Sequence, residues 1–199
     1  MIARDGADYG SAKRRALREL VGDAHPTAQL LPDNAEVEQE VRRYQALFLA
    51  DQPARLRFLR VIAQEVMTQL AQFRPYLTGA VLNGTAGAHD DVCLHLFADS
   101  AKDVLLFLLD RDVQITLHTA PHATTHASAH AKGARHEPLE TVSFNWRKQA
   151  VHATLYEVND LRSAVKARAD KRLLRADIDA VRAMLADTEP EKVATDEKK

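Results

Sequence analysis

The sequence has one cysteine, few aromatic residues and almost no net charge, and each shortage excludes a class of protein. Cys93 is the single cysteine, so no internal disulfide can form, as is usual in a reducing compartment. A formal net charge of −1 does not favour nucleic acid as a partner. The longest apolar run, 104–109, is far shorter than the roughly 20 residues of a membrane-spanning helix. The first residues lack the apolar core of a signal peptide, so we expect a cytoplasmic protein with no membrane partner.

The order of the sequence patterns predicts a single α+β domain. With 199 residues, 46% of them hydrophobic, the chain can form one sizeable core. Residues 1–75 read as a helical segment packed on this core, 76–158 as strands with one inserted helix, and 159–187 as C-terminal helices. We expect a central antiparallel or mixed sheet flanked by helices, with an exposed histidine-rich loop at 119–137 and a disordered tail at 188–199.

Periodicity and turn residues place the individual elements. Helices are predicted at 11–21, from Asp33 or Asn34 to about 50, and at 53–73, 100–110, 159–169 and 175–185. Strands are predicted at 77–83, 92–97, 113–117, 139–146 and 151–158, with a hairpin turn at Lys148-Gln149. The second helix carries an apolar stripe formed by Val37, Val41, Tyr44, Leu47 and Phe48.

The most informative stretch is 78–99, which reads as strand, glycine turn, aspartate and alternating strand. It resembles the signature of the polymerase-β-type nucleotidyltransferase superfamily, in which Gly and Gly/Ser are followed by a connector and then by Asp–apolar–Asp/Glu–apolar. Gly84-Thr85 stands at the Gly-Ser position and Asp91-Val92-Cys93-Leu94 at the carboxylate pair. The resemblance covers roughly 73–158.

More narrowly, the sequence FRPYLTGAVLNGTAG…LHLFADSAKDV is similar to sequences of a small proteobacterial family described as nucleotidyltransferase-like. Members sometimes carry the label UDP-N-acetylmuramate–alanine ligase. The sequence gives that label no support, because it has no Gly-Lys-Ser/Thr phosphate loop and less than half the length of such a ligase.

The superfamily resemblance implies nucleotide chemistry with Mg²⁺. Gly84 and Thr85 would bind the nucleotide, because backbone amides at such a bend can approach a phosphate. Asp91 would be a catalytic Mg²⁺ ligand, and Glu157 or Glu140 would supply a carboxylate from a later strand. Cys93, at the position of the second carboxylate, is a soft ligand that Mg²⁺ does not prefer.

Three interpretations of this motif stay open. The first is a nucleotidyltransferase-like protein with a degenerate metal centre, inactive or weakly active, that binds a nucleotide or a protein. The second is a divergent active transferase that uses Asp91 with Asp90 or a later glutamate. The third is a simple strand–turn–strand in which Gly84 serves a turn and Cys93 is a small buried hydrophobe.

Two further hypotheses concern other parts of the sequence. The amphipathic helix 33–50 suggests a protein-interaction module that binds a partner or a second copy of the chain. His122, His126 and His130 recur every four residues, and on a helix they would share a face that can chelate Zn²⁺, Ni²⁺ or Cu²⁺. A second soft-metal candidate is formed by Asp91, Cys93 and His95, which alternate onto one strand face.

Overall fold

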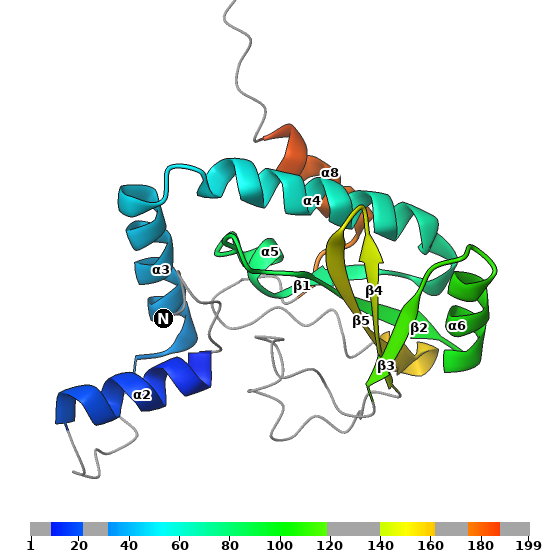
Figure 1. The fold of residues 1–199 in the computed structure, drawn as a ribbon, viewed down its shortest axis with the longest axis horizontal. Coiled ribbons are helices and arrows are strands. Elements are labelled where there is room, and N and C mark those ends of the chain that lie inside the picture. The colour runs from blue at the N-terminus through cyan, green and yellow to red at the C-terminus, as the bar shows by residue number, and fades with distance from the viewer. Residues whose placement is uncertain (1–8, 22–31, 119–139, 162–174, 188–199) are drawn as a thin grey trace, which may run out of the picture.

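Five strands form one mixed sheet in the order β1-β2-β5-β4-β3, with helices around it (Figure 1). The computed structural model describes residues 9–21, 32–118, 140–161 and 175–187. The strands are β1 Tyr76–Thr78, β2 Val92–Ala98, β3 Ile115–His118, β4 Glu140–Trp146 and β5 Gln149–Glu157. The helices are α2 Tyr9–Val21, α3 Asn34–Phe48, α4 Gln52–Gln69, α5 Gly79–Asn83, α6 Ala101–Leu109 and α8 Ile178–Ala186, with short 3₁₀ turns at Ala71–Phe73 and Val158–Asp160. The mixed α/β class with helices beside a mixed sheet is therefore confirmed.

The centre of the sheet is a parallel pair joined across a long stretch of sequence. β2 lies parallel to β5 with Val92 opposite Val151 and Ala98 opposite Glu157. The other neighbours, β1 with β2, β4 with β5 and β3 with β4, are antiparallel. Ala176 continues the sheet beyond β1 through two backbone hydrogen bonds to Leu77.

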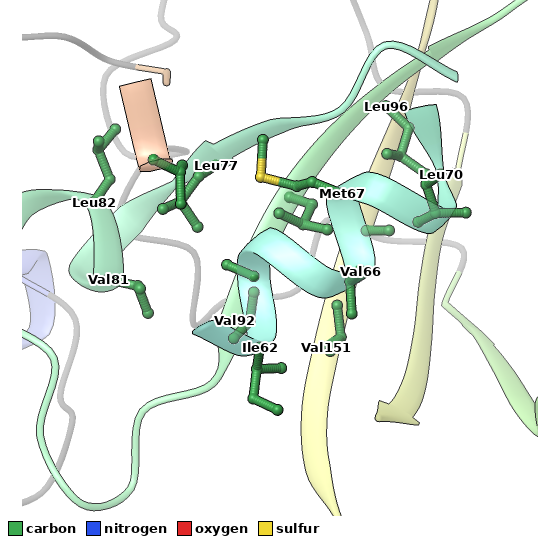
Figure 2. Close-up of a cluster of buried hydrophobic side chains, with 14 of the residues drawn as sticks. Ile62, Val66, Met67, Leu70, Leu77, Val81, Leu82, Val92, Leu96 and Val151 are labelled. Atoms are coloured by element: carbon green, nitrogen blue, oxygen red, sulfur yellow. The ribbon is translucent and has the colours of Figure 1, made fainter. Parts of the chain in front are cut away.

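The core lies between α4 and one face of the sheet (Figure 2). α4 turns Ile62, Val66 and Met67 inward, and these side chains meet the apolar face of β2 and β5. α8 packs beside α4, as Figure 1 shows, and contributes Val181 to the same cluster. Because every inward side chain of β2 on this face is apolar, the alternation that predicted the strand also predicts which side of it packs on helices.

The prediction of a strand over 77–83 is wrong beyond Thr78. The strand ends there because Gly79 adopts φ +72°, a left-handed conformation that no extended strand contains. Residues 79–83 then form the short helix α5, which Gly84 terminates at φ +79°. A short apolar run fits a buried strand and a buried helix equally well, so periodicity could not decide between them.

The β4–β5 hairpin forms one residue earlier than predicted. Trp146 lies opposite Gln149, so the turn is Arg147-Lys148, and both residues have positive φ (48° and 67°). Two consecutive positive φ angles are the mark of a type I′ turn, which normally prefers Asn-Gly. Gln149 consequently belongs to β5, where its side chain is available to the site described below.

Helix α3 begins as predicted but faces the protein with its polar side. Asp33 caps it, accepting a hydrogen bond from the Glu36 amide, and the Glu36 side chain accepts one from the Asp33 amide. Of the apolar stripe only Val41 is buried, whereas Leu47 and Phe48 are exposed. The buried face consists of Asn34, Glu38, Val41 and Gln45. An amphipathic helix ordinarily turns its apolar stripe toward the core. The buried face of α3 instead contacts polar groups of Asn83 and Thr85.

Several expectations lie outside the described residues. These are the histidine-rich loop 119–137, with His122, His126 and His130, most of the helix expected at 159–169, and the tail 188–199.

Candidate functional site

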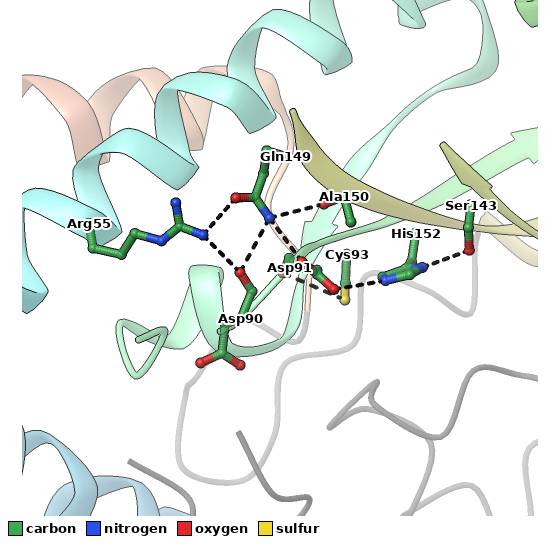
Figure 3. Close-up of polar contacts among 8 residues, drawn as sticks. All are labelled: Arg55, Asp90, Asp91, Cys93, Ser143, Gln149, Ala150 and His152. Carbon is green, nitrogen blue, oxygen red and sulfur yellow. Dashed lines mark hydrogen bonds and ion pairs between the residues drawn. The ribbon is translucent and has the colours of Figure 1, made fainter. Parts of the chain in front are cut away.

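Asp91 lies immediately before β2, where two side chains from β5 reach its carboxylate (Figure 3). Gln149 donates from Nε2 to Oδ1 at 2.9 Å, and His152 Nε2 lies 3.1 Å from Oδ2. The Asp91 side chain is 37% exposed. Its two oxygens are therefore each engaged by a protein group before any ligand arrives.

The contact continues from His152 to Ser143 on β4, since Ser143 Oγ lies 2.7 Å from His152 Nδ1. A neutral imidazole protonated on Nε2 would donate to Asp91 and accept from the Ser143 hydroxyl. The order Ser–His–Asp is that of a hydrolase triad, but Ser143 sits inside an interior strand, paired with Thr116 on one side and His152 on the other. Backbone amides committed to the sheet cannot form an oxyanion hole, so the arrangement favours a structural network over nucleophilic catalysis.

The structure does not bring Glu157 or Glu140 to Asp91. Asp91 precedes β2 at the level of Val92, whereas Glu157 pairs with Ala98 at the far end of the parallel pair. Six residues of strand separate those two levels by about 20 Å. Glu140 pairs with Leu155, which is also toward that far end. Among the described residues no three His, Cys, Asp or Glu side chains form a group that could hold a metal ion.

Asp90, the other candidate partner of Asp91, closes a turn with its own carboxylate. Its Oδ2 accepts the amide N–H of Gly87 at 2.8 Å. Its backbone carbonyl faces Arg55 and Gln149, while the carboxylate points away from them (Figure 3). A Mg²⁺ ion prefers several hard oxygen ligands in near-octahedral geometry, and Asp91 alone does not fit that requirement.

Gly84 and Thr85 lie at the end of α5, and the amides after Gly84 are already used. The N–H groups of Thr85 and Ala86 both donate to the carbonyl of Ala80, at 3.0 and 3.2 Å. The next amide, that of Gly87, donates to Asp90. Thr85 is also buried. The bend therefore does not present the row of free amides that the resemblance implies for phosphate binding.

Side chains from α3 and α4 instead surround this segment with donors. Gln45 donates to the carbonyl of Thr85 at 2.7 Å, and Gln52 to those of Gly84 and Ala86 at 3.2 and 2.8 Å. On α3 the contact accounts for the burial of Gln45, because the buried Thr85 carbonyl needs a hydrogen-bond partner, while the buried Glu38 accepts from the Asn83 side chain.

Three arginines reach the same segment, which we call the 81–91 loop. Arg42 donates to the carbonyl of Asn83 at 3.0 Å, and Arg60 to that of Val81 at 3.3 Å. Arg55 lies 3.5 Å from the carbonyl of Asp90 and donates to Gln149 Oε1 at 2.6 Å. Within the part of the chain that the structure describes, none of the three forms an ion pair with a carboxylate.

Sequence reasoning singled out none of these three arginines. It drew attention to the glycine turn and Asp91 instead, because these residues stand close together in the sequence. The signal that could have found Arg42 and Arg55 is their spacing from Gln45 and Gln52, three residues apart on consecutive helices, which places donors together on one helix face.

Cys93 and His95, the other members of the soft-metal candidate, are buried on β2. Burial, followed by the charges of Asp91 and Asp90, raises the pKa of the Cys93 thiol to about 12, so it stays protonated near neutral pH. Burial, with a smaller contribution from Arg175, lowers the pKa of His95 to about 3, and its ring packs on Tyr156. Within the described residues Asp91, Cys93 and His95 do not come together as a group that could hold a metal ion.

A separate hollow of about 460 Å³ opens beside the β4–β5 turn, lined by Asp112, Val113, Gln114, Asn145, Trp146 and Arg147. Arg147 is paired there with Glu65 at 2.9 Å, and Trp146 Nε1 donates to the same glutamate. None of the lining residues belongs to the Asp91 contacts or to the 81–91 loop. The convergence of donors around the loop is therefore the stronger candidate site.

Together these features define a mixed-sheet α/β domain in which three arginines contact the 81–91 loop and the carboxylate of Asp91 contacts Gln149 and His152. Comparison with protein-family models, with curated proteins and with solved structures finds no match for this chain. Among the helices in the described ranges, none combines the length and the apolar character needed to cross a bilayer.

Proposed function

We propose that this chain is a nucleotidyltransferase-like scaffold that lacks transfer chemistry and binds a nucleotide. The observation that carries the proposal is the environment of Asp91. Its carboxylate is engaged by Gln149 and His152, and the later-strand glutamates lie toward the other end of the sheet.

The local frame supports the scaffold part of the proposal. A strand ends at a glycine bend, a short helix and a second glycine follow, and an aspartate stands just before the next strand. This is the order of features on which the resemblance to nucleotidyltransferases rests, although a helix has replaced part of the expected strand.

We infer that transfer chemistry is absent because too few carboxylates lie near Asp91. Phosphoryl transfer by two metal ions needs carboxylates that share the ions and neutralise the triphosphate. Among the described residues Asp91 belongs to no group of three metal-ligating side chains, the carboxylate of Asp90 accepts from the Gly87 amide, and the side chain two residues after Asp91 is a thiol that stays protonated. We expect no release of pyrophosphate above a protein-free control.

The nucleotide part of the proposal is supported by the donors at the 81–91 loop. Guanidinium and amide groups around a bend are suited to phosphate and to the polar edge of a base. The test is a thermal-shift series with ATP, CTP, GTP and UTP, with and without Mg²⁺. We expect stabilisation by at least one nucleotide, and no shift with any of the four would remove the support for nucleotide binding.

Asp91→Asn separates binding from metal chemistry. Asparagine keeps an oxygen for Gln149, so we expect the nucleotide-dependent shift to be unchanged. The matched control is Asp99→Asn, an exposed aspartate directly after β2. A shift that requires Mg²⁺ and disappears only in Asp91→Asn would show a working metal centre and contradict the proposal.

A second candidate is self-association through α3, favoured by its exposed apolar end. Leu47 and Phe48 are 68% and 65% exposed, and the ring of Phe48 packs against Tyr44 with 4.8 Å between centroids. Light scattering after size exclusion, across a range of concentrations, tests whether a dimer forms and whether Phe48→Ser dissociates it. A monomer at every concentration would exclude this candidate.

A further inference from the structure

We infer that the phosphates of the ligand are held by Arg42 and Arg60 beside Asn83-Gly84, with Arg55 at the other end of the loop, and that no divalent cation takes part. The inference rests on the proposed function, whose binding site it specifies. It predicts a ligand class, free polyphosphate anions, rather than the Mg²⁺ complexes that transferases use.

The geometry places two guanidinium groups at one point of the chain. Arg42, from α3, donates to the carbonyl of Asn83. Arg60, from α4, donates to the carbonyl of Val81, and its Nη2 lies 3.8 Å from the position that a Cβ on Gly84 would occupy. Two helices thus bring positive charge to within one residue of the same glycine.

Within the described ranges these arginines form no direct ion pair, and the buried carboxylate nearby, Glu38 on α3, accepts from the side chain of Asn83 at 3.3 Å. A carbonyl oxygen accepts one N–H of the five that a guanidinium offers, and it carries no net charge. Other arginines do pair with carboxylates, as Arg147 does with Glu65 and Arg182 with Asp179, both at 2.9 Å. Within the described ranges Arg42, Arg55 and Arg60 have only neutral acceptors.

Two of these guanidinium groups are partly withdrawn from water. Burial lowers the pKa of Arg60, since a guanidinium withdrawn from water is less stable in its charged form. The Nε of Arg55 is buried without any hydrogen-bond partner. A phosphate group would supply charged oxygens, two of which can accept from the planar fork of one guanidinium group.

A divalent cation has no role in this arrangement. Asp91, the Mg²⁺ ligand that the resemblance implies, already accepts from Gln149 and faces His152, and the carboxylate of Glu38 accepts from Asn83. A cation bound to the phosphates would also reduce the negative charge that attracts the arginines. The free anion should therefore bind at least as well as its Mg²⁺ complex.

The experiment is calorimetric titration of the full chain with ATP and with inorganic tripolyphosphate, each in EDTA and in excess Mg²⁺. We expect binding in EDTA, equal or weaker binding in Mg²⁺, and weaker binding as NaCl rises. Arg42→Gln and Arg60→Gln should each weaken binding by about tenfold or more. Arg43→Gln is the matched control, because Arg43 is exposed beside Arg42 on the same helix; its affinity should stay within about twofold.

Folding of the variants is checked by circular dichroism. Arg42→Lys and Arg60→Lys keep the positive charge but lose the planar guanidinium group that can donate two parallel hydrogen bonds. If a glutamine variant unfolds, the lysine variant carries the test, with an intermediate loss of affinity expected.

The outcomes distinguish this inference from the proposed function. Tripolyphosphate bound in EDTA as tightly as ATP would support the arginine site and contradict a nucleotide preference. ATP bound only with Mg²⁺, and equally by the arginine variants, would overturn the inference and leave nucleotide binding intact. No binding of either ligand in any buffer would overturn both.

Discussion

Helices α3 and α4 follow each other in sequence and are both amphipathic, yet they face the protein with opposite sides. α4 buries Ile62, Val66 and Met67 against the sheet, whereas α3 buries Glu38 and Gln45 and leaves Leu47 exposed. The difference shows that the neighbour decides which side of a helix is buried. An apolar sheet face packs with apolar side chains, whereas the polar groups of the loop pair with a donor at Gln45 and an acceptor at Glu38.

The largest effect is expected on the apolar side. Ile62→Ala removes a fully buried side chain from the α4–sheet interface and leaves a cavity, so we expect a loss of about 2 to 5 kcal/mol in the free energy of unfolding. Urea denaturation followed by circular dichroism measures it. Thr68→Ala, an exposed position on the same helix, should change stability by less than about 0.5 kcal/mol. A small effect at Ile62 would mean that α4 does not depend on this interface.

The polar side should be nearly as sensitive. Gln45→Leu removes the donor to the Thr85 carbonyl and leaves that buried oxygen without it, which costs about 1 to 3 kcal/mol. Gln39→Leu is the control, because Gln39 is exposed on the same helix. If leucine at position 45 stabilised the protein in the same urea titration, α3 would not be held by its polar side.

The same contrast exists on β2, whose apolar face meets α4 and whose other face carries His95. The folded-state pKa of His95, about 3, lies below its ordinary value of 6.5, so the folded protein favours the neutral ring. As pH falls from about 6.5 toward 3, the unfolded chain takes up a proton that the folded protein refuses, and stability decreases. Between pH 7 and pH 5 we expect a loss of about 1 to 2 kcal/mol from this group.

His95→Phe tests that loss by removing the titrating group while keeping a ring against Tyr156. Urea titrations at the two pH values should show less acid destabilisation in the variant than in the wild type. Equal losses in both proteins would mean that His95 is protonated in the folded state.

The smallest effect is expected at the exposed end of α3. Leu47→Gln should change the stability of the monomer by less than about 0.5 kcal/mol, since this side chain has little contact to lose. Thermal unfolding at low protein concentration measures it. A large loss there would show that the apolar stripe of α3 is covered in solution.

Local features were predictable and relative placement was not. The cap at Asp33 and the alternation of β2 depend on near neighbours in sequence, and the structure confirms both. The short helix α5 was missed because two glycines with positive φ, rather than periodicity, set its limits. Side-chain spacing could not reveal that β2 and β5 run parallel, which is why Glu157 seemed available to Asp91.

In the candidate site, too, residues close together in the sequence were predictable and residues brought together by the fold were not. Asp91 and Gly84 stand close together in sequence, so a motif could point to them. Gln149 and His152 reach Asp91 from about 60 residues later, and Arg42 and Arg60 belong to different helices. Only the tertiary fold brings these groups to one loop, so their convergence was beyond a reading of spacing.

The parallel pairing of β2 with β5 also governs how the chain can mature during synthesis. The central strand pair cannot form until residues 149–157 have been synthesised, long after residues 92–98. The bridge between Leu77 and Ala176 forms later still. Contacts between residues far apart in the sequence slow folding, so partly folded chains expose hydrophobic surface for longer. When a nascent chain has emerged only as far as β4, β2 lacks its parallel neighbour, and we expect such a chain to aggregate more readily than the complete one.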